Sequence, residues 1–265
     1  MGILTRSAWQ LLLLLFTLSL TACATTRIPI APGTVPKVVS PSVEERRQGE
    51  QIKRGILSKI PLTTSPRYTR RVNYVVRRLL AATGSQDRWS VYVLKAPEWN
   101  AFTSQGNNIY IYTGLLDDLR DDEQLAAVVA HELAHNLARH IVPTTDEIVN
   151  QMLGQIAGAV VQNALSESSG QTANAGGAVA SEFVQGFVWN PHSQKLELEA
   201  DHIGMFLMAD AGFNPAKALT VWEKQARQEE YSRSSFFRTH PPSVERLESL
   251  QRLLPQAQRR YIRRR

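Results

Sequence analysis

The segment "RDDEQLAAVVAHELAHNLARHI" (120–141) constrains the fold most, because its local signals agree on a single helix. Asp121 is a suitable N-cap, and acidic side chains directly after it suit the positive end of the helix dipole. Arg139 and His140 suit the negative end, and Pro143 is expected to stop the helix. We therefore predict a helix that begins after Asp121 and ends before Pro143.

Two histidines lie four residues apart in this segment and therefore share one face of the predicted helix. His131 and His135 can direct two imidazole nitrogens at one ion, and zinc accepts such ligands at about 2.0–2.1 Å. Glu132, one residue round the helix, can reach a water on that ion and take its proton. The alternative is an ordinary amphipathic helix, but small apolar neighbours favour a buried face, where unpaired histidines are costly.

A catalytic zinc needs a third protein ligand and an open fourth position. The segment "KLELEADHIG" (195–204) places Glu197, Asp201 and Gly204 near one helical face. With Glu197 as the ligand, Asp201 is positioned to accept the outer N–H of a ligating histidine. Gly204 would let two helices approach closely.

Other residues compete for these roles. Glu199 points away from the face of Glu197, and a solvated acidic helix surface is the plain interpretation of it. His192 and His202 are alternative third ligands, because zinc prefers histidine.

The rest of the chain predicts a globular, mostly helical α+β protein. Its 265 residues are 43% hydrophobic and 20% charged, with a net charge of +6, enough for one domain or at most two small ones. Residues 89–95 and 108–114 have the alternation of strands, and we expect them to pair in a small sheet. Helical periodicity covers most of the remainder, and residues 166–177 are expected to form a loop that acts as a lid.

The N-terminus predicts export. Residues 1–22 have a basic start and a short apolar run, which is typical of a signal peptide. The sole cysteine, Cys23, ends a sequence that resembles a lipobox, and its acylation would anchor the protein. Ala24 favours the outer membrane by resemblance to enterobacterial sorting. An ordinary signal peptide or an uncleaved anchor is the alternative.

These features divide the chain into four parts. The predicted signal peptide at residues 1–22 is followed by a proline-rich tether at residues 23–43, and the predicted catalytic domain occupies residues 44–255. The basic residues 256–265 are interpreted as a solvated tail, with contact to anionic lipid as the alternative. No nucleic-acid-binding motif accompanies them, so we expect no nucleic-acid partner.

Several motifs together resemble metallopeptidase family 48, the gluzincins of HtpX, Oma and BepA type, and most of all the short lipoproteins of LoiP type. The chain has no apolar run long enough for the membrane helices of HtpX-like members. The motifs occur in the expected order, as "NAFT" (100–103), "GNNIYIYTGLL" (106–116), "HELAHNLARH" (131–140), "SQKLELEAD" (193–201) and "RTHPPSVERL" (238–247).

The resemblance implies a zincin-type domain with a role for each matching residue. It implies one zinc ion per chain on His131, His135 and Glu197, with Glu132 as general base. Asp201 would be the outer residue that supports one of the ligating histidines. His240 would polarise the substrate carbonyl or stabilise the oxyanion, although a turn histidine is the alternative. Asn100 and Asn108 are expected to contact an extended substrate beside the "NNIYIYTG" strand, although Asn100 could be a loop residue.

We therefore predict a zinc-dependent endopeptidase anchored as a lipoprotein at the periplasmic face of the outer membrane. Its substrates would be misfolded or unassembled envelope proteins. The first alternative is a non-proteolytic chaperone or assembly factor for outer-membrane proteins on the same fold. The second is a structural envelope module in which zinc only stabilises the domain.

Overall fold

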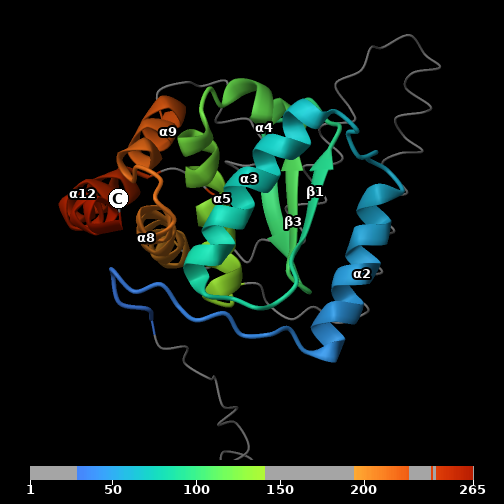
Figure 1. Cartoon of the computed structure of the whole chain (residues 1–265), viewed down its shortest axis with the longest axis horizontal. Coiled ribbons are helices and arrows are strands. Elements are labelled where there is room, and N and C mark those ends of the chain that lie inside the picture. The colour runs from blue at the N-terminus through green and yellow to red at the C-terminus, as the bar shows by residue number, and fades with distance from the viewer. Residues whose placement is uncertain (1–28, 141–193, 227–239, 241–242, 265) are drawn as a thin grey trace, which may run out of the picture.

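The computed structural model describes residues 29–140, 194–226, 240 and 243–264. Cys23, His192 and the predicted lid at 166–177 lie outside these ranges. The described part is mostly helical with a three-stranded sheet, which confirms the predicted α+β class (Figure 1). Within it, none of the helices combines the length and the apolar character needed to cross a bilayer.

The helices and strands follow the predicted periodicities closely. They are α2 (Val43–Leu57), α3 (Pro66–Thr83), β1 (Ser90–Leu94), β2 (Ala101–Ser104), β3 (Asn108–Tyr112), α4 (Thr113–Asp118), α5 (Asp122–Leu137), α8 (Gln194–Asp210), α9 (Ala216–Ala226) and α12 (Val244–Arg264).

The sheet has the strand order β1-β3-β2, with β1 parallel and β2 antiparallel to β3. The expected pairing of the two predicted strands is therefore confirmed. Alternation along β3 sends Ile109 and Ile111 into the larger core and Tyr110 and Tyr112 into a smaller one under α2. The sheet is thus buried on both faces.

A substrate strand beside β3, as expected from the sequence, is excluded by this topology. Both edges of β3 are already hydrogen-bonded, one to β1 and the other to β2. Within the described ranges β2 pairs only with β3, so its outer edge is the candidate for strand addition.

The helix α5 lies at the centre of the larger core. It contacts α8, α9, α3 and β2, while α12 packs across α8 and α9 (Figure 1). The Asp121 side chain caps α5 by accepting the backbone N–H of Gln124 at 2.7 Å. This central position explains why α5 is apolar on nearly every side.

The helix α5 ends at Leu137, earlier than the expected stop at Pro143. Arg139 adopts a left-handed backbone conformation with φ 54°, which turns the chain out of the helix. The backbone N–H of His140 then donates to the carbonyl of His135 at 2.8 Å. An ion pair of 2.6 Å between Arg139 and Glu45 accompanies the turn.

Both ends of the described chain are more structured than the sequence suggests. Residues 256–264 continue α12, because Ala257 is buried and Arg260 pairs with Asp210. Arg260 also donates to the carbonyl of Gly33 at 2.8 Å. Residues 29–42, within the predicted tether, therefore lie against the domain, where Ile30, Val35 and Val38 pack on the core.

Gly204 allows α8 to approach α5 closely, as expected from the sequence. A Cβ atom at this position would lie 3.0 Å from the backbone nitrogen of His131 and 3.1 Å from the carbonyl carbon of Ala130. The site residues of the two helices face each other across this contact.

We predict that Gly204→Val destabilises the fold by about 1–3 kcal/mol, because its side chain must push the two helices apart. Urea unfolding of the metal-free protein measures this change. Lys195→Val, at an exposed position of α8, is the control and should shift stability by less than about 0.5 kcal/mol. Equal effects of the two substitutions would contradict the close-packing role of Gly204.

Candidate metal centre

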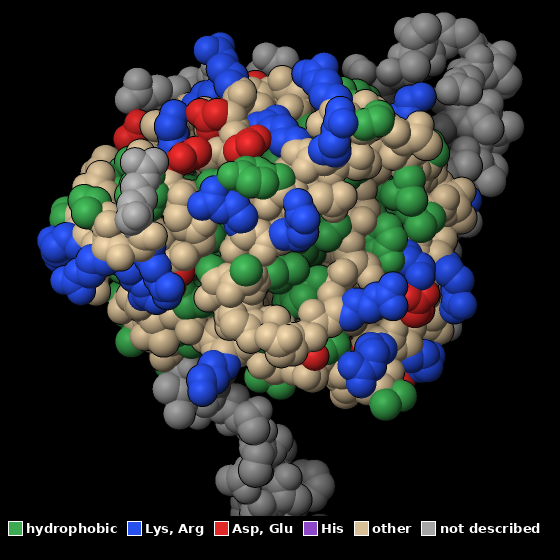
Figure 2. Space-filling model, in the orientation of Figure 1, with side chains coloured by type: hydrophobic (Ala, Val, Ile, Leu, Met, Phe, Trp, Pro, Cys, Tyr) green, Lys and Arg blue, Asp and Glu red, His purple; other side chains and the backbone are tan. Residues whose placement is uncertain are grey.

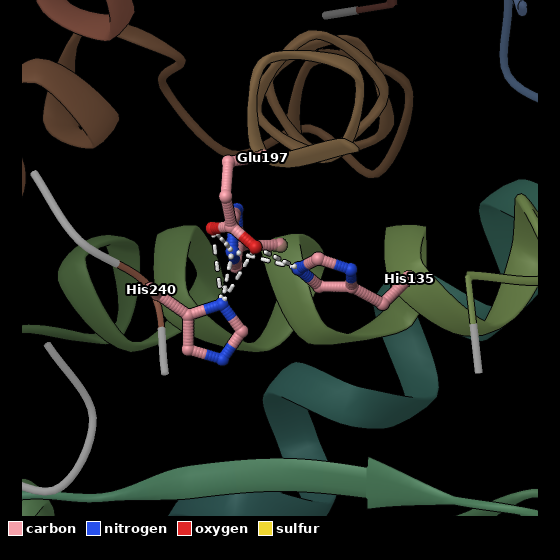
Figure 3. A group of neighbouring side chains, drawn as sticks. His135, Glu197 and His240 are labelled. Carbon is pink, nitrogen blue, oxygen red and sulfur yellow. Dashed lines mark hydrogen bonds and ion pairs between the residues drawn. The ribbon is translucent and has the colours of Figure 1, made fainter. Parts of the chain in front are cut away.

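Four buried side chains converge between α5 and α8. His131 and His135 come from α5, Glu197 comes from α8, and His240 precedes α12 (Figure 3). One ligand atom from each lies within 4.8 Å of all the others. No histidine of the described residues is visible on the face drawn in Figure 2, in line with the burial of His131, His135 and His240.

The spacing of these atoms matches a tetrahedral zinc site. His131 Nε2 lies 3.1 Å from His135 Nε2, and the two nitrogens each lie 3.3 Å from a different oxygen of Glu197. Ligands about 2.0–2.1 Å from a tetrahedral ion are about 3.3–3.4 Å apart. Nitrogen and carboxylate lone pairs that converge in a buried space are costly without a cation. The group can therefore hold a metal ion.

His240 belongs to the same group. Its Nδ1 lies 3.3 Å from His131 Nε2 and 3.0 Å from Glu197 Oε2, and its Nε2 lies 3.4 Å from Glu132 Oε1. The Nδ1 atom of His240, which was expected from the resemblance to act on a substrate carbonyl or oxyanion through its side chain, thus lies among the other ligand atoms. The structure offers four protein ligand atoms here, where a catalytic zinc site uses three.

Glu132 is fully buried beside this group. Among the described residues, neither of its carboxylate oxygens accepts a hydrogen bond. Burial raises its pKa, and the positive charges of His240 and His131 offset only part of that effect. The backbone carbonyl of Glu132 accepts the hydroxyl of Thr103 at 3.2 Å, which ties α5 to β2. A buried carboxylate that accepts no hydrogen bond from the described residues is suited to a water or substrate group that binds there.

Asp201 supports the opposite side of His131, as its spacing suggested. Its Oδ1 lies 2.9 Å from His131 Nδ1, and Arg246 clamps the same carboxylate with bonds of 2.7 and 2.9 Å. Arg246 also lies 3.3 Å from Glu197 and donates to the carbonyl of His240 at 3.2 Å. Reasoning from the sequence missed Arg246, although it occurs in the segment "RTHPPSVERL".

His135 has a different support. Its Nδ1 lies 2.9 Å from Nδ1 of His140, and Nε2 of His140 lies 3.0 Å from Glu199 Oε2. Glu199 is buried, so its interpretation as a solvated acidic residue is wrong. His140 does more than finish a helix, because the turn at Arg139 folds it back against His135.

Three other candidates lie apart from the four-residue group. Asn108 donates to the carbonyl of Gln105 at 2.9 Å, and His202 bonds to Ser249 at 2.7 Å. Asn100 is buried, and its side-chain amide has no hydrogen-bond partner in the described part of the chain. Among the described residues, His202 is not a member of the cluster of possible metal ligands.

The charges of the group are strongly coupled. Burial alone lowers the pKa of His131, but hydrogen bonds and charge from Asp201 and Glu197 outweigh it and raise the pKa to about 9. Burial holds the pKa of His135 well below its ordinary value. For Glu197, the charges of His240, His135 and Arg246 outweigh burial and keep its pKa well below normal.

We predict opposite pH dependences for the metal-free and the zinc-loaded protein. The pKa of His131 is about 9 in the metal-free fold and about 6.5 when unfolded. Its contribution to stability is therefore complete below about pH 6.5 and is lost as pH rises towards 9. Zinc needs the neutral imidazole, so stability gained from zinc should increase over this range. Urea midpoints with chelator and with zinc measure both slopes, and identical slopes would contradict the prediction.

Comparisons with known proteins were consistent with this geometry. The family model for peptidase family M48 matches residues 66–254. The mitochondrial metalloendopeptidase OMA1 of Schizosaccharomyces pombe is 30% identical over 220 residues, covering 81% of this chain and 62% of the relative. Metalloprotease LoiP of Escherichia coli K12 is 30% identical over 168 residues, covering 63% and 62% of the two chains.

A third relative is the beta-barrel assembly-enhancing protease of Escherichia coli O157:H7. It is 28% identical over 210 residues, which cover 77% of this chain and 42% of the relative. The chain thus spans less than two thirds of the length of each of these relatives.

Proposed function

Because this chain belongs to peptidase family M48, we propose that it is a zinc-dependent metalloendopeptidase that holds its metal with His131, His135 and Glu197. The observation that carries the proposal is the convergence of these ligand atoms beside the buried carboxylate of Glu132. Neither oxygen of this carboxylate accepts a hydrogen bond from the described residues, although His240 Nε2 lies 3.4 Å away, and a hydrolase needs a general base in this position.

Bound zinc would polarise a substrate carbonyl and acidify a water molecule. Glu132 is the general base of the proposal, taking a proton on a carboxylate oxygen and later giving it to the leaving amine. Its raised pKa brings it closer to neutral pH, where both transfers are efficient. Asp201 keeps the ring of His131 oriented, and Arg246 keeps Asp201 charged.

In this proposal the described arrangement is the resting state of the site, because His240 occupies the position that a catalytic zinc keeps open. Its Nδ1 supplies a fourth ligand atom, whereas a catalytic zinc site keeps one position open. His131, Glu132 and His240 are at most 1% exposed, which leaves no approach for a polypeptide. Hydrolysis therefore requires the side chain of His240 to move away.

The proposed substrate is an extended polypeptide paired with β2. The Thr103–Glu132 hydrogen bond brings β2 alongside the general base. Recognition through backbone hydrogen bonds gives low sequence specificity, which suits misfolded or unassembled envelope proteins. The name of the beta-barrel assembly-enhancing relative supports that substrate class. The lipobox-like sequence at Cys23 supports anchoring at the outer membrane.

One observation favours a structural zinc site as the second candidate function. Four protein ligand atoms form a closed set, as in sites that only stabilise a fold. The buried Glu132 argues against it, because a structural site has no use for a second buried carboxylate beside its four ligands.

We predict that Glu132→Gln retains about one zinc per chain but loses casein cleavage by two or more orders of magnitude. Metal analysis and a caseinase assay on the purified protein measure the two properties. Glu98→Gln is the matched control, because Glu98 also has a buried oxygen without a partner and a raised pKa. A Glu132→Gln variant as active as the wild type would contradict the proposed role of Glu132 as general base.

We predict that His240→Ala increases the rate of casein cleavage and weakens zinc binding, because it removes the fourth ligand atom. His202→Ala is the control and should leave both properties unchanged, because His202 forms a hydrogen bond with Ser249 and is not a member of the four-residue group. A loss of cleavage with zinc retained would instead assign His240 the oxyanion role expected from the sequence.

A further inference from the structure

A line of hydrogen bonds leads from His135 to the N-terminal segment, residues 29–42. His135 Nδ1 meets His140 Nδ1 at 2.9 Å, and His140 Nε2 meets Glu199 Oε2 at 3.0 Å. The other oxygen of Glu199 accepts the backbone N–H of Ile30. Three separate parts of the chain, the end of α5, α8 and the N-terminal segment, thus meet behind one member of the four-residue group.

The protons along this line have one consistent assignment when His135 uses Nε2 as a metal ligand. His135 then carries its proton on Nδ1 and donates to the bare Nδ1 of His140. His140 carries its proton on Nε2 and donates to the carboxylate of Glu199. Glu199 accepts from His140 with one oxygen and from Ile30 with the other. Each donor therefore has an acceptor, and His135 is held in the tautomer that a metal requires.

The side chains that form this line of hydrogen bonds are buried in the fold. The side chains of His140 and Glu199 are 3% and 9% exposed. The left-handed turn at Arg139 and the backbone bond from His140 to His135 fix where the second imidazole lies. Low exposure strengthens these hydrogen bonds and makes the loss of any one costly.

The far end of the line depends on how the N-terminal segment is docked. Ile30 packs partly against the core, and the carbonyl of Gly33 accepts from Arg260 of α12. Phe206 and Gln256 also line the backbone at Gly33. These contacts fix the position from which the N–H of Ile30 reaches Glu199.

We propose that His140, Glu199 and the N–H of Ile30 form a positioning chain that holds His135 for the metal, so that tight metal binding depends on the docked N-terminal segment. The inference rests on the proposed metal site and extends it beyond the domain core. His131 is held separately by Asp201 and Arg246. The two ligands of α5 therefore have separate supports among the described contacts, and that of His135 reaches residues 29–42.

The test measures zinc affinity of the full chain by chelator competition, with the visible spectrum of the cobalt-substituted protein as a second readout. Removal of an outer partner typically weakens metal binding about 10–100-fold. We expect this loss and an altered cobalt spectrum for His140→Ala and Glu199→Gln. His202→Ala is the matched control on α8, and His140→Gln should recover part of the affinity if hydrogen bonding, not volume, is what matters.

A pair of substitutions isolates the N-terminal segment. Ile30→Pro removes the N–H that Glu199 accepts, whereas Ile30→Ala keeps the N–H and removes only the side chain. We expect Ile30→Pro to weaken zinc binding severalfold, and Ile30→Ala, which loosens the docking of the segment but keeps the N–H, to weaken it clearly less. Combined with Glu199→Ala, Ile30→Pro should add nothing further, because Glu199→Ala already removes the acceptor of that N–H.

The outcomes separate this inference from the proposed function. A wild-type chain that binds no zinc refutes the metal site itself. A wild type that binds one zinc, with His140→Ala, Glu199→Gln and Ile30→Pro binding it as tightly, overturns the positioning chain alone. Equal weakening by Ile30→Ala and Ile30→Pro overturns the role of the N–H. Circular dichroism of each metal-free variant confirms that the comparison is made on folded protein.

Discussion

The close packing of α5 on α8 is the contact on which the site depends. It is possible because Gly204 has no side chain where α8 meets the backbone of His131. The contact sets His131 and His135 on one helix against Glu197 and Asp201 on the other. A rigid frame of this kind is what a zinc site needs, because the ion tolerates little variation in ligand distance.

The same contact creates an electrostatic problem that the surrounding residues resolve. Four ligand side chains and Glu132 are almost completely removed from water. Arg246 compensates the carboxylates of Glu197 and Asp201, and its two hydrogen bonds to Asp201 fix the acceptor that faces the ring of His131. The remaining convergence of lone pairs is stabilised only by a cation or by protons. Asp201 and Glu197 raise the pKa of His131, whereas burial lowers the pKa of His135.

The sequence predicted what depends on local signals. Helical periodicity, the cap at Asp121 and the spacing of His131, His135 and Glu197 were sufficient to find the main helices and to propose three members of the group, whereas His240 came from the family resemblance. Local signals could not predict features set by tertiary packing. The left-handed turn at Arg139 places His140 against His135, and the strand order puts β3 between β1 and β2. Contacts made by the chain ends, such as Arg260 with Gly33, likewise have no local signature.

X-ray absorption spectroscopy at the zinc edge, on the full chain as purified, tests the central claim most directly. We expect one zinc with three imidazole nitrogens and one carboxylate oxygen at about 2.0–2.1 Å. A His135→Ala variant should lose one imidazole from that set. Absence of stoichiometric zinc, or a coordination shell unchanged in the His135→Ala variant, would contradict it.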